Sequence, residues 1–209
     1  MRSVDISVVV TNFNYGRFIR RCIRSLLNQD LDRHFYEIIV VDDCSTDDSL
    51  IALEPFRSSG EIRVVVNKEN LGVGGSARAG VNHSRAKFFV RVDADDYVQP
   101  QFLYILYHFL RLNQNYIGVS CDYFLTTEDE KILSVQSFAD QGIACGLMLR
   151  TSYLEKVGSY DPTLRLFEDK DLISRVDMER VYHLPIPIYN YVKHGNSLTD
   201  NTKLGTGAD

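Results

Sequence analysis

Four short apolar segments of this chain each end in polar residues that can take part in chemistry. They are residues 6–10 before Thr11, residues 38–41 before Asp42 and Asp43, residues 64–66 before Asn67, and residues 88–92 before Asp93-Ala94-Asp95-Asp96. Apolar runs of this length, separated by helical patterns, are typical of strands buried in a parallel sheet. Because ligands of such sheets bind beyond the carboxyl ends of the strands, we expect the four polar clusters to converge in space.

Apolar residues at helical spacing predict helices between these strands. The predicted helices cover residues 16–29, 49–56, 73–84 and 101–112, and the predicted strands cover residues 6–10, 37–41, 62–66 and 87–92. Strands and helices that alternate in this way favour right-handed β-α-β crossovers. The sequence therefore predicts an α/β fold with a mostly parallel central sheet flanked by helices.

The second half of the chain has a less regular pattern. Residues 117–125 and 131–135 resemble an antiparallel pair of strands, and residues 151–157 and 168–177 resemble helices. Residues 180–192 contain Pro185 and Pro187 and are expected to form extended edge structure. The polar, glycine-containing tail at residues 199–209 is expected to be mobile.

Composition narrows the class of protein. A chain of 209 residues with 44% hydrophobic and 24% charged residues is long enough for one substantial globular domain. Its net charge of −5 argues against a general nucleic-acid binder. No apolar run reaches the roughly 18 residues that span a membrane, and the start of the chain does not resemble a signal peptide, so we expect a cytoplasmic protein. The scattered cysteines favour reduced thiols over a zinc site.

The Asp-x-Asp step at Asp93 and Asp95 directly follows the fourth predicted strand. Carboxylate oxygens are hard ligands that suit Mg²⁺ or Mn²⁺, and Mg²⁺ usually completes its shell with water and substrate phosphates. The alternative is that Asp95 or Asp96 caps the helix that begins near Pro100. For the isolated motif, both interpretations stand.

The residues after the first two strands also allow two interpretations each. Asp42 and Asp43 can form a turn or cap a helix, or one of them can form a hydrogen bond to a base or a ribose. Beyond Thr11, Phe13 can act as an aromatic shelf for a flat base, or the segment is an ordinary loop between a strand and a helix.

Three further segments contain residues that can carry chemistry. The glycine-rich segment 70–75 can let backbone approach a phosphate, with Arg78 as its partner, or it can serve close packing of a helix on the sheet. Glu168 and Asp169 open a predicted helix, where acids complement the helix dipole; the functional alternative is a general base. His194 lies in a polar loop and becomes a candidate only if it reaches a metal.

The first predicted helix has a basic stripe opposite its apolar face, formed by Arg17, Arg20, Arg21 and Arg24. The usual interpretation of such a stripe is a solvated face. A second interpretation is peripheral contact with an anionic acceptor or with the lipid surface at the inner face of the membrane.

Six segments, taken in order, resemble those of family 2 glycosyltransferases of the GT-A fold. They are Ser-Val-Val-Val-Thr-Asn-Phe-Asn, Val-Val-Asp-Asp-Cys-Ser-Thr-Asp, Asn-Leu-Gly-Val-Gly-Gly-Ser-Ala-Arg, Val-Asp-Ala-Asp-Asp, Phe-Glu-Asp-Lys-Asp-Leu and Lys-His-Gly-Asn-Ser. The resemblance implies one glycosyltransferase domain, residues 1–209. Within it, residues 1–97 would bind a nucleotide sugar, residues 98–198 would supply the acceptor and catalytic half, and residues 199–209 would be a flexible tail.

The resemblance also implies which residues bind the donor, a nucleoside-diphosphate sugar. Thr11 and Phe13 would border the nucleotide base, and Asp43 would form a hydrogen bond to it. Asp93 would face the ribose or the sugar. Arg78 would lie in the donor-side segment, although the asparagine that often follows this arginine in the family is missing. The resemblance favours UDP as the nucleotide.

The remaining roles concern the metal and the reaction. Asp95 and His194 would hold Mn²⁺ or Mg²⁺, Asp169 would be the catalytic base, and Glu168 would shape the acceptor site. The implied reaction transfers a hexosyl group with inversion to a hydroxyl of a glycan or a lipid-linked acceptor, in the synthesis of cell-surface polysaccharides or glycoconjugates.

Two other functions remain open, and one subclass is excluded. The chain has no tryptophan, so it lacks the Gln-x-x-Arg-Trp motif of processive polysaccharide synthases, and a non-processive enzyme is favoured. A nucleotidyltransferase that makes nucleotide sugars would need a glycine-rich N-terminal loop ending in a basic residue, but residues 11–16 contain one glycine. A non-catalytic nucleotide-sugar-binding module would not need Asp169.

Overall fold

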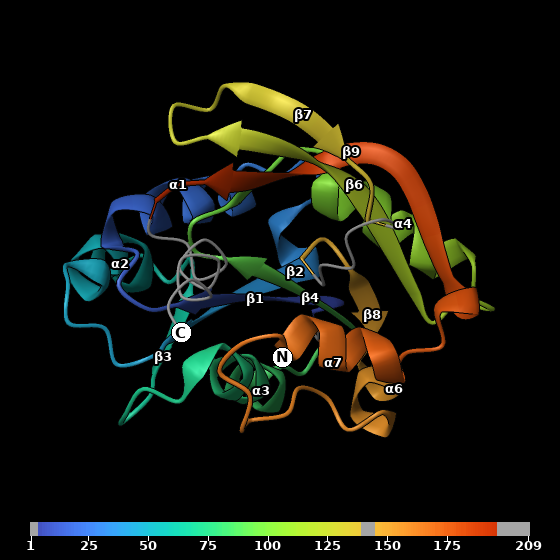
Figure 1. Ribbon diagram of the computed structural model, residues 1–209, viewed down its shortest axis with the longest axis horizontal. Helices are drawn as coiled ribbons and strands as arrows, with labels where there is room; N and C mark the ends of the chain where they lie inside the picture. The colour runs from blue at the N-terminus through green and yellow to red at the C-terminus, as the bar shows by residue number, and fades with distance from the viewer. Residues whose placement is uncertain (1–3, 139–144, 196–209) are drawn as a thin grey trace, which may run out of the picture.

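The computed structural model describes residues 4–138 and 145–195 and has a nine-stranded mixed sheet at its centre (Figure 1). The strand order is β3-β2-β1-β4-β8-β6-β9-β5, and β7 pairs with β6. The first half contributes β1 (Ile6–Asn12), β2 (Tyr36–Asp42), β3 (Arg63–Val66) and β4 (Phe88–Asp93). These strands pair in parallel, so the parallel arrangement predicted from the alternating pattern is confirmed.

The pairing register brings the ends of three strands to one edge of the sheet. Thr11 of β1 pairs with Val41 of β2 and with Asp93 of β4, and Asn12 pairs with Asp42. All of β1 is buried, and a slip of one residue would move its apolar side chains to the opposite face. The polar residues that follow β1, β2 and β4 therefore converge, as the sequence predicts.

Helices cover both faces of the sheet (Figure 1). One face packs against α1 (Gly16–Leu27), α2 (Ser49–Ser58) and α4 (Phe102–Leu112), and the other against α3 (Gly72–His83), α6 (Thr151–Lys156) and α7 (Glu168–Arg175). Side chains alternate along a strand, so Val8 and Val10 join the first core while Val9 joins the second. Short 3-10 turns at Arg33–Phe35 and Met178–Arg180 precede β2 and β9.

The second half of the chain continues the same sheet. β6 (Gly118–Thr127) and β7 (Ile132–Gln136) form the predicted antiparallel pair. β8 (Met148–Arg150) pairs antiparallel with both β4 and β6 and so joins the two halves. β8 and β5 (Tyr97–Val98) were not predicted, because strands of two or three residues leave no recognisable alternation.

The edge position predicted for residues 180–192 needs correction. The segment is extended, as β9 (Val181–Lys193), but it pairs in parallel with β6 on one side, and Tyr189 and Asn190 pair with β5 on the other. The register between β6 and β9 shifts on both sides of Asp122, where Pro185 and Pro187 enter the strand. Proline has no N–H to donate, so this irregular pairing accommodates it inside the sheet.

Three expectations concern the chain as a whole. Cys22, Cys121 and Cys145 are buried free thiols, as expected, and Cys44 is partly buried. Among the residues that the structure describes, no helix has the length and apolar composition needed to cross a membrane. The tail at residues 199–209 lies outside the described residues.

Candidate active site

Asp93 ends β4 at the carboxyl edge of the sheet, and polar groups surround its carboxylate. Oδ1 accepts a hydrogen bond from Thr11 Oγ1 at 3.2 Å and pairs with Nε of Arg91 at 3.2 Å. The thiol of Cys145 lies 2.9 Å from Oδ2, and burial together with the Asp93 charge raises the pKa of that thiol. Two predicted donor residues, Thr11 and Asp93, are thus in contact, and Cys145 joins them from the second half of the chain.

The two predicted metal ligands, Asp95 and His194, lie together. Nε2 of His194 is 2.8 Å from Oδ2 of Asp95, although 99 residues separate them in the chain. The imidazole has no exposed surface. Its ring centroid lies 4.7 Å from that of Phe18 and 5.6 Å from that of Tyr15. His194 is therefore a buried part of the site and not an exposed loop residue.

Asp96 fixes the strand that carries His194. Its Oδ1 accepts a hydrogen bond from the backbone N–H of Val192 at 2.8 Å, and its Oδ2 accepts one from the Tyr189 hydroxyl at 2.7 Å. The same hydroxyl accepts a hydrogen bond from the N–H of Asp93 at 3.3 Å. These bonds tie the end of β9 to the end of β4, which holds the imidazole beside its carboxylate partner.

The clustered carboxylates fit a divalent cation. Burial raises the pKa of Asp95, and the Asp93 charge adds to this, whereas the hydrogen bond from His194 lowers it. Burial and the charges of Asp95 and Asp93 raise the pKa of Asp96 well above its ordinary value. A cation would relieve this repulsion, and carboxylates with an imidazole are suitable ligands. Neither Asp95 nor Asp96 caps α4; the Gln29 side chain instead accepts a hydrogen bond from the backbone N–H of Leu103 at 2.8 Å, so the capping interpretation is wrong.

Further atoms that can bind a metal ion, two carboxylate oxygens and a thiol sulfur, lie close together at the end of β4. Asp93, Asp96 and Cys145 each offer one ligand atom, and these atoms lie within 4.8 Å of one another. The acidic end of β4 is therefore bordered on two sides by groups that can contact a cation. A hard cation such as Mg²⁺ prefers the oxygens of this set over its sulfur.

Glu168 and Asp169 occupy the first turn of α7 and reach the end of β4 through Arg91. Nη1 of Arg91 lies 2.8 Å from Oε1 of Glu168, and Nη2 lies 2.9 Å from Oδ1 of Asp169. Arg91 was not singled out from the sequence. The signal is nevertheless there, because a charged residue interrupts an apolar strand and lies two positions before Asp93, on the same face of the sheet. The structure thus links the predicted base to the donor-side carboxylate.

Asp43 orders a loop at the same edge. Its Oδ1 accepts a hydrogen bond from the N–H of Leu71 at 2.9 Å, and its Oδ2 accepts one from the N–H of Gly72 at 2.8 Å. Asp43 therefore caps α3, and not the helix that follows β2. Asp42 is buried and accepts a hydrogen bond from Nδ2 of Asn12 at 2.7 Å. Contact between Asp43 and a nucleotide base stays a prediction.

Phe13 has an exposed side chain, whereas the side chain of Arg78 forms hydrogen bonds within the protein. Phe13 follows β1 and is 42% exposed, so part of its ring is open to a ligand. Arg78 projects from α3, and its Nη1 donates hydrogen bonds to the carbonyl oxygens of Gly158 and Tyr160, the latter at 3.3 Å. These bonds occupy Nη1 of the guanidinium and give Arg78 a structural role, so its donor-binding role stays a prediction.

The glycines of α3 lie against neighbouring backbone and side chains. A Cβ added at Gly74 would lie 2.5 Å from the carbonyl oxygens of Asp161 and Leu164, and one added at Gly80 would lie 2.3 Å from Cγ1 of Val9. Real Cβ atoms essentially never approach other atoms so closely. Within the segment 70–75, Gly74 thus packs closely against backbone outside the sheet, whereas Gly80, five residues beyond that segment, is the glycine that packs the helix on β1.

The arginine stripe on α1, formed by Arg17, Arg20, Arg21 and Arg24, lines a groove of about 690 Å³ beside the site. Nη2 of Arg17 lies 3.1 Å from Oε1 of Glu128, in the turn after β6. Nη2 of Arg21 donates a hydrogen bond to the carbonyl oxygen of Asp95 at 3.0 Å. The guanidinium groups of Arg20 and Arg24 form no hydrogen bond or ion pair within residues 4–138 and 145–195. Two exposed cations of the stripe thus remain available.

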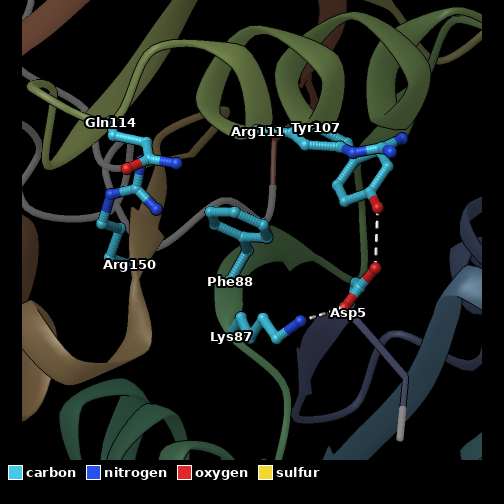
Figure 2. Close-up of a pocket in the computed structure, with 7 residues that line it drawn as sticks. All are labelled: Asp5, Lys87, Phe88, Tyr107, Arg111, Gln114 and Arg150. Atoms are coloured by element: carbon cyan, nitrogen blue, oxygen red, sulfur yellow. Dashed lines mark hydrogen bonds and ion pairs between the residues drawn. The ribbon is translucent and has the colours of Figure 1, made fainter. Parts of the chain in front are cut away.

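Another pocket, of about 420 Å³, lies at the opposite edge of the sheet (Figure 2). Asp5 and Lys87, which precede β1 and β4, line it together with Tyr107 of α4. Asp5 pairs with Nζ of Lys87 at 3.2 Å and accepts a hydrogen bond from the Tyr107 hydroxyl at 2.7 Å. None of the predicted site residues lines this pocket, so the candidate site is the carboxyl edge.

A match to a known protein family identifies the family of this chain. The sequence profile of glycosyl transferase family 2 matches residues 7–171, which include the strand ends and both acidic motifs described above. The chain belongs to glycosyltransferase family 2. Its match covers Asp93, Asp95, Glu168 and Asp169, whereas His194 lies beyond the matched range.

Relatives of this family 2 chain are named as glycosyltransferases. A poly(ribitol-phosphate) β-glucosyltransferase of Bacillus spizizenii is 34% identical over 114 residues, which is 54% of this chain and 18% of that protein. The chain therefore spans less than a fifth of this relative. Among solved structures, residues 1–349 of TarS from Staphylococcus aureus in complex with UDP-GlcNAc match with a TM-score of 0.82 and 21% identity, over 93% of this chain and 60% of that one.

A second solved structure gives the same fold at greater distance. The mannosyltransferase PcManGT of Pyrobaculum calidifontis, in complex with GDP-Man and Mn²⁺, matches with a TM-score of 0.73 and 16% identity, over 94% of this chain and 59% of that one. Likeness at this level of identity establishes architecture. The predicted GT-A fold of this family 2 chain is confirmed.

Proposed function

We propose that this family 2 chain is an inverting, metal-assisted and non-processive glycosyltransferase that uses a UDP-sugar. One observation carries the proposal: the carboxylates of Asp93 and Asp95 lie at one edge of the sheet, where Asp95 contacts His194 and Arg91 links Asp93 to Asp169. This is the edge at which open α/β sheets bind ligands. The TarS structure holds UDP-GlcNAc, which favours UDP over other nucleotides.

The donor would lie against residues 1–97. Phe13 offers a partly exposed ring on which the base would stack, and Thr11 would border that base. The base would form a hydrogen bond with Asp43, whose carboxylate already fixes the adjoining loop, and Arg78 lies in the helix that follows that loop. The ribose or the sugar would face Asp93. The support for these roles is that β1, β2 and β4 end at the carboxyl edge and that Asp43 ties the start of α3 to it.

Asp95 and His194 would hold Mn²⁺ or Mg²⁺ in this site. A bound divalent ion would neutralise the negative charge that develops on the leaving diphosphate. The support is the donor set of this chain: the buried Asp95 carboxylate carries a raised pKa, and a fully buried imidazole lies against it. The PcManGT complex contains Mn²⁺, in agreement with that choice of ion.

Asp169 would activate the acceptor. Its side chain is 18% exposed, so one side faces Arg91 while another is open to a ligand. Asp169 would remove the proton from the acceptor hydroxyl while that oxygen attacks the anomeric carbon from the face opposite the diphosphate, which inverts this centre. Glu168, which is almost fully buried, would shape the wall of the acceptor site in residues 98–198.

The arginine stripe would contact a phosphate-bearing acceptor used in cell-surface polymer synthesis. Arg20 and Arg24 carry unpaired charge among the described residues, and the relative from Bacillus spizizenii is named for poly(ribitol-phosphate). A lipid-linked acceptor at the inner face of the membrane would present the same charge. Changing Arg20 and Arg24 together to Glu should weaken binding to inorganic polyphosphate by at least about tenfold, since two phosphate contacts are lost and repulsion is added. Unchanged binding would refute this contact.

Joint binding of UDP and Mn²⁺ is the first test of the proposal. At ligand concentrations near 100 times Kd, a binding linkage of about 2.7 kcal/mol is expected, which raises the Tm of a chain of this size by about 5 °C or more. UDP without metal should give a clearly smaller shift. If UDP gives no shift with Mn²⁺ present, the donor site is wrongly assigned.

The two alternative functions predict different products. A nucleotidyltransferase would release pyrophosphate from a nucleoside triphosphate and a sugar phosphate, whereas a binding module would bind UDP-GlcNAc without consuming it. A glycosyltransferase releases UDP from its nucleotide sugar. Assaying both products with the same protein therefore separates the three functions.

A further inference from the structure

Arg91 is a buried cation in the middle of the central sheet. It lies in β4, only 1% of its side chain is exposed, and apolar residues flank it in the strand. Burying a charge without partners is strongly unfavourable, so its ion pairs must be retained for the fold to hold. Burial lowers the pKa of Arg91, but the charges of Asp169 and Asp93 outweigh it and raise that pKa, so the guanidinium stays charged.

The guanidinium joins carboxylates from two separate parts of the chain. Nε lies 3.2 Å from Oδ1 of Asp93 at the end of β4, Nη1 lies 2.8 Å from Oε1 of Glu168, and Nη2 lies 2.9 Å from Oδ1 of Asp169. The donors of arginine form a rigid planar fork, so one side chain sets the relative positions of all three carboxylates. The ring of Tyr160 lies 5.5 Å from the guanidinium carbon and packs against it.

The first turn of α7 carries both of the more distant carboxylates that pair with Arg91. The helix is preceded by Phe167, which has a left-handed backbone conformation (φ 62°), is 57% exposed and provides no side-chain cap. Glu168 and Asp169 are the first two residues of the helix. Their ion pairs with Arg91 therefore hold this turn against the end of β4.

We infer that Arg91 is a positioning residue, which fixes Asp169 at a set distance from the donor-side carboxylate Asp93. This inference rests on the proposed function, in which Asp169 takes the acceptor proton. A base misplaced by 1 Å can reduce the rate by about 10²-fold. The fork of Arg91 spans both reacting partners of the transfer, so it aligns the acceptor oxygen with the anomeric carbon.

The test compares Arg91→Lys with the wild type in the hydrolysis of UDP-GlcNAc with Mn²⁺. Lysine keeps the charge but has no fork, so we expect kcat to fall about 10²-fold while KM for UDP-GlcNAc and Kd for UDP change less than about threefold. In Arg91→Ala, guanidinium ion added at millimolar concentration should raise kcat at least about tenfold above the value without the ion. It should restore nothing in Asp169→Asn.

Arg150→Lys is the matched control, because it removes another structural fork from the same sheet. The guanidinium of Arg150 donates to the carbonyl oxygens of Tyr116 and Leu110, at 2.9 and 2.8 Å, near the opposite edge. This variant should lower Tm and leave kcat unchanged. A near-normal kcat in Arg91→Lys, or equal losses of kcat and UDP affinity, would overturn the inference.

The experiment distinguishes an error in the proposed function from an error in the positioning role of Arg91. If the wild type binds neither UDP nor Mn²⁺ and consumes no UDP-hexose, both ideas fall. If the wild type is active and Arg91→Lys is equally active, only the positioning role falls. Should Arg91→Ala not fold, the comparison of Arg91→Lys with Arg150→Lys still decides.

Discussion

Replacing Asp169 with Asn is expected to lower kcat for sugar transfer by about 10³-fold, within the range that a general base contributes. The amide is close in shape to the carboxylate but cannot take a proton from the acceptor hydroxyl. Asp93 and Glu168 still neutralise Arg91, so the fold should hold. The release of UDP from UDP-GlcNAc gives kcat, and calorimetric titration with UDP and Mn²⁺ should give a Kd within about threefold of the wild type, because the donor contacts remain.

Asp171→Asn is the matched control for this substitution. Asp171 lies in the same helix but pairs with Arg175, and about a third of its side chain is exposed. Its loss should leave kcat unchanged, because it contacts none of the groups joined by Arg91. If Asp169→Asn retains transfer close to that of Asp171→Asn, then Asp169 is not the base.

The second large effect is expected at His194. His194→Ala removes an imidazole that lies 2.8 Å from the Asp95 carboxylate, so one of the two proposed protein ligands is lost. The Mn²⁺ concentration for half-maximal activity should rise at least about tenfold, since even residues that only support metal ligands are worth about 10–100-fold in affinity. A titration of activity against Mn²⁺ measures this directly.

His34→Ala controls for the loss of a histidine elsewhere. His34 is half exposed and pairs with Asp32 in the turn before β2, at the opposite end of that strand from Asp43. It should leave the Mn²⁺ dependence unchanged. His194→Ala also opens a gap beneath Phe18 and Tyr15, so its Tm is measured with and without Mn²⁺. An unaltered Mn²⁺ dependence in a folded His194→Ala protein would exclude His194 as a ligand.

The fold of the first half could be predicted because its strands are signalled locally. The runs at residues 38–41 and 88–92 lie within β2 and β4 and make up most of each strand, and parallel pairing then brings their polar ends together. The second half lacks that signal. β5 and β8 are two and three residues long and exist only because neighbouring strands pair with them. Pro185 and Pro187 pointed to an edge, but the irregular register with β6 accommodates them.

The candidate site was predicted in part, for a similar reason. Asp95 and His194 were expected to meet, and they do so because Asp96 and Tyr189 tie β9 to β4. Neither of those supporting residues carries a pattern of its own in the sequence. Arg91 shows the same limit: its importance comes from the carboxylates of Glu168 and Asp169, which lie 77 and 78 positions away in the chain and are brought to it by the tertiary fold.

The position of Asp43 was predicted from the sequence, but its hydrogen-bond partners were not. The residue was expected at a strand end, and it is there. Its carboxylate, however, accepts hydrogen bonds from the start of α3, 28 and 29 residues further along the chain. Local capping rules look only to the helix that follows, so they missed this bond.

The most direct test of the central claim is a crystal structure of the protein in complex with UDP and Mn²⁺, in which the anomalous scattering of manganese is recorded. We expect one strong anomalous peak in contact with Asp95 and His194, with the diphosphate of UDP beside it and the uracil near Phe13. A manganese peak at another place, or UDP bound away from the carboxyl edge of the sheet, would contradict the account.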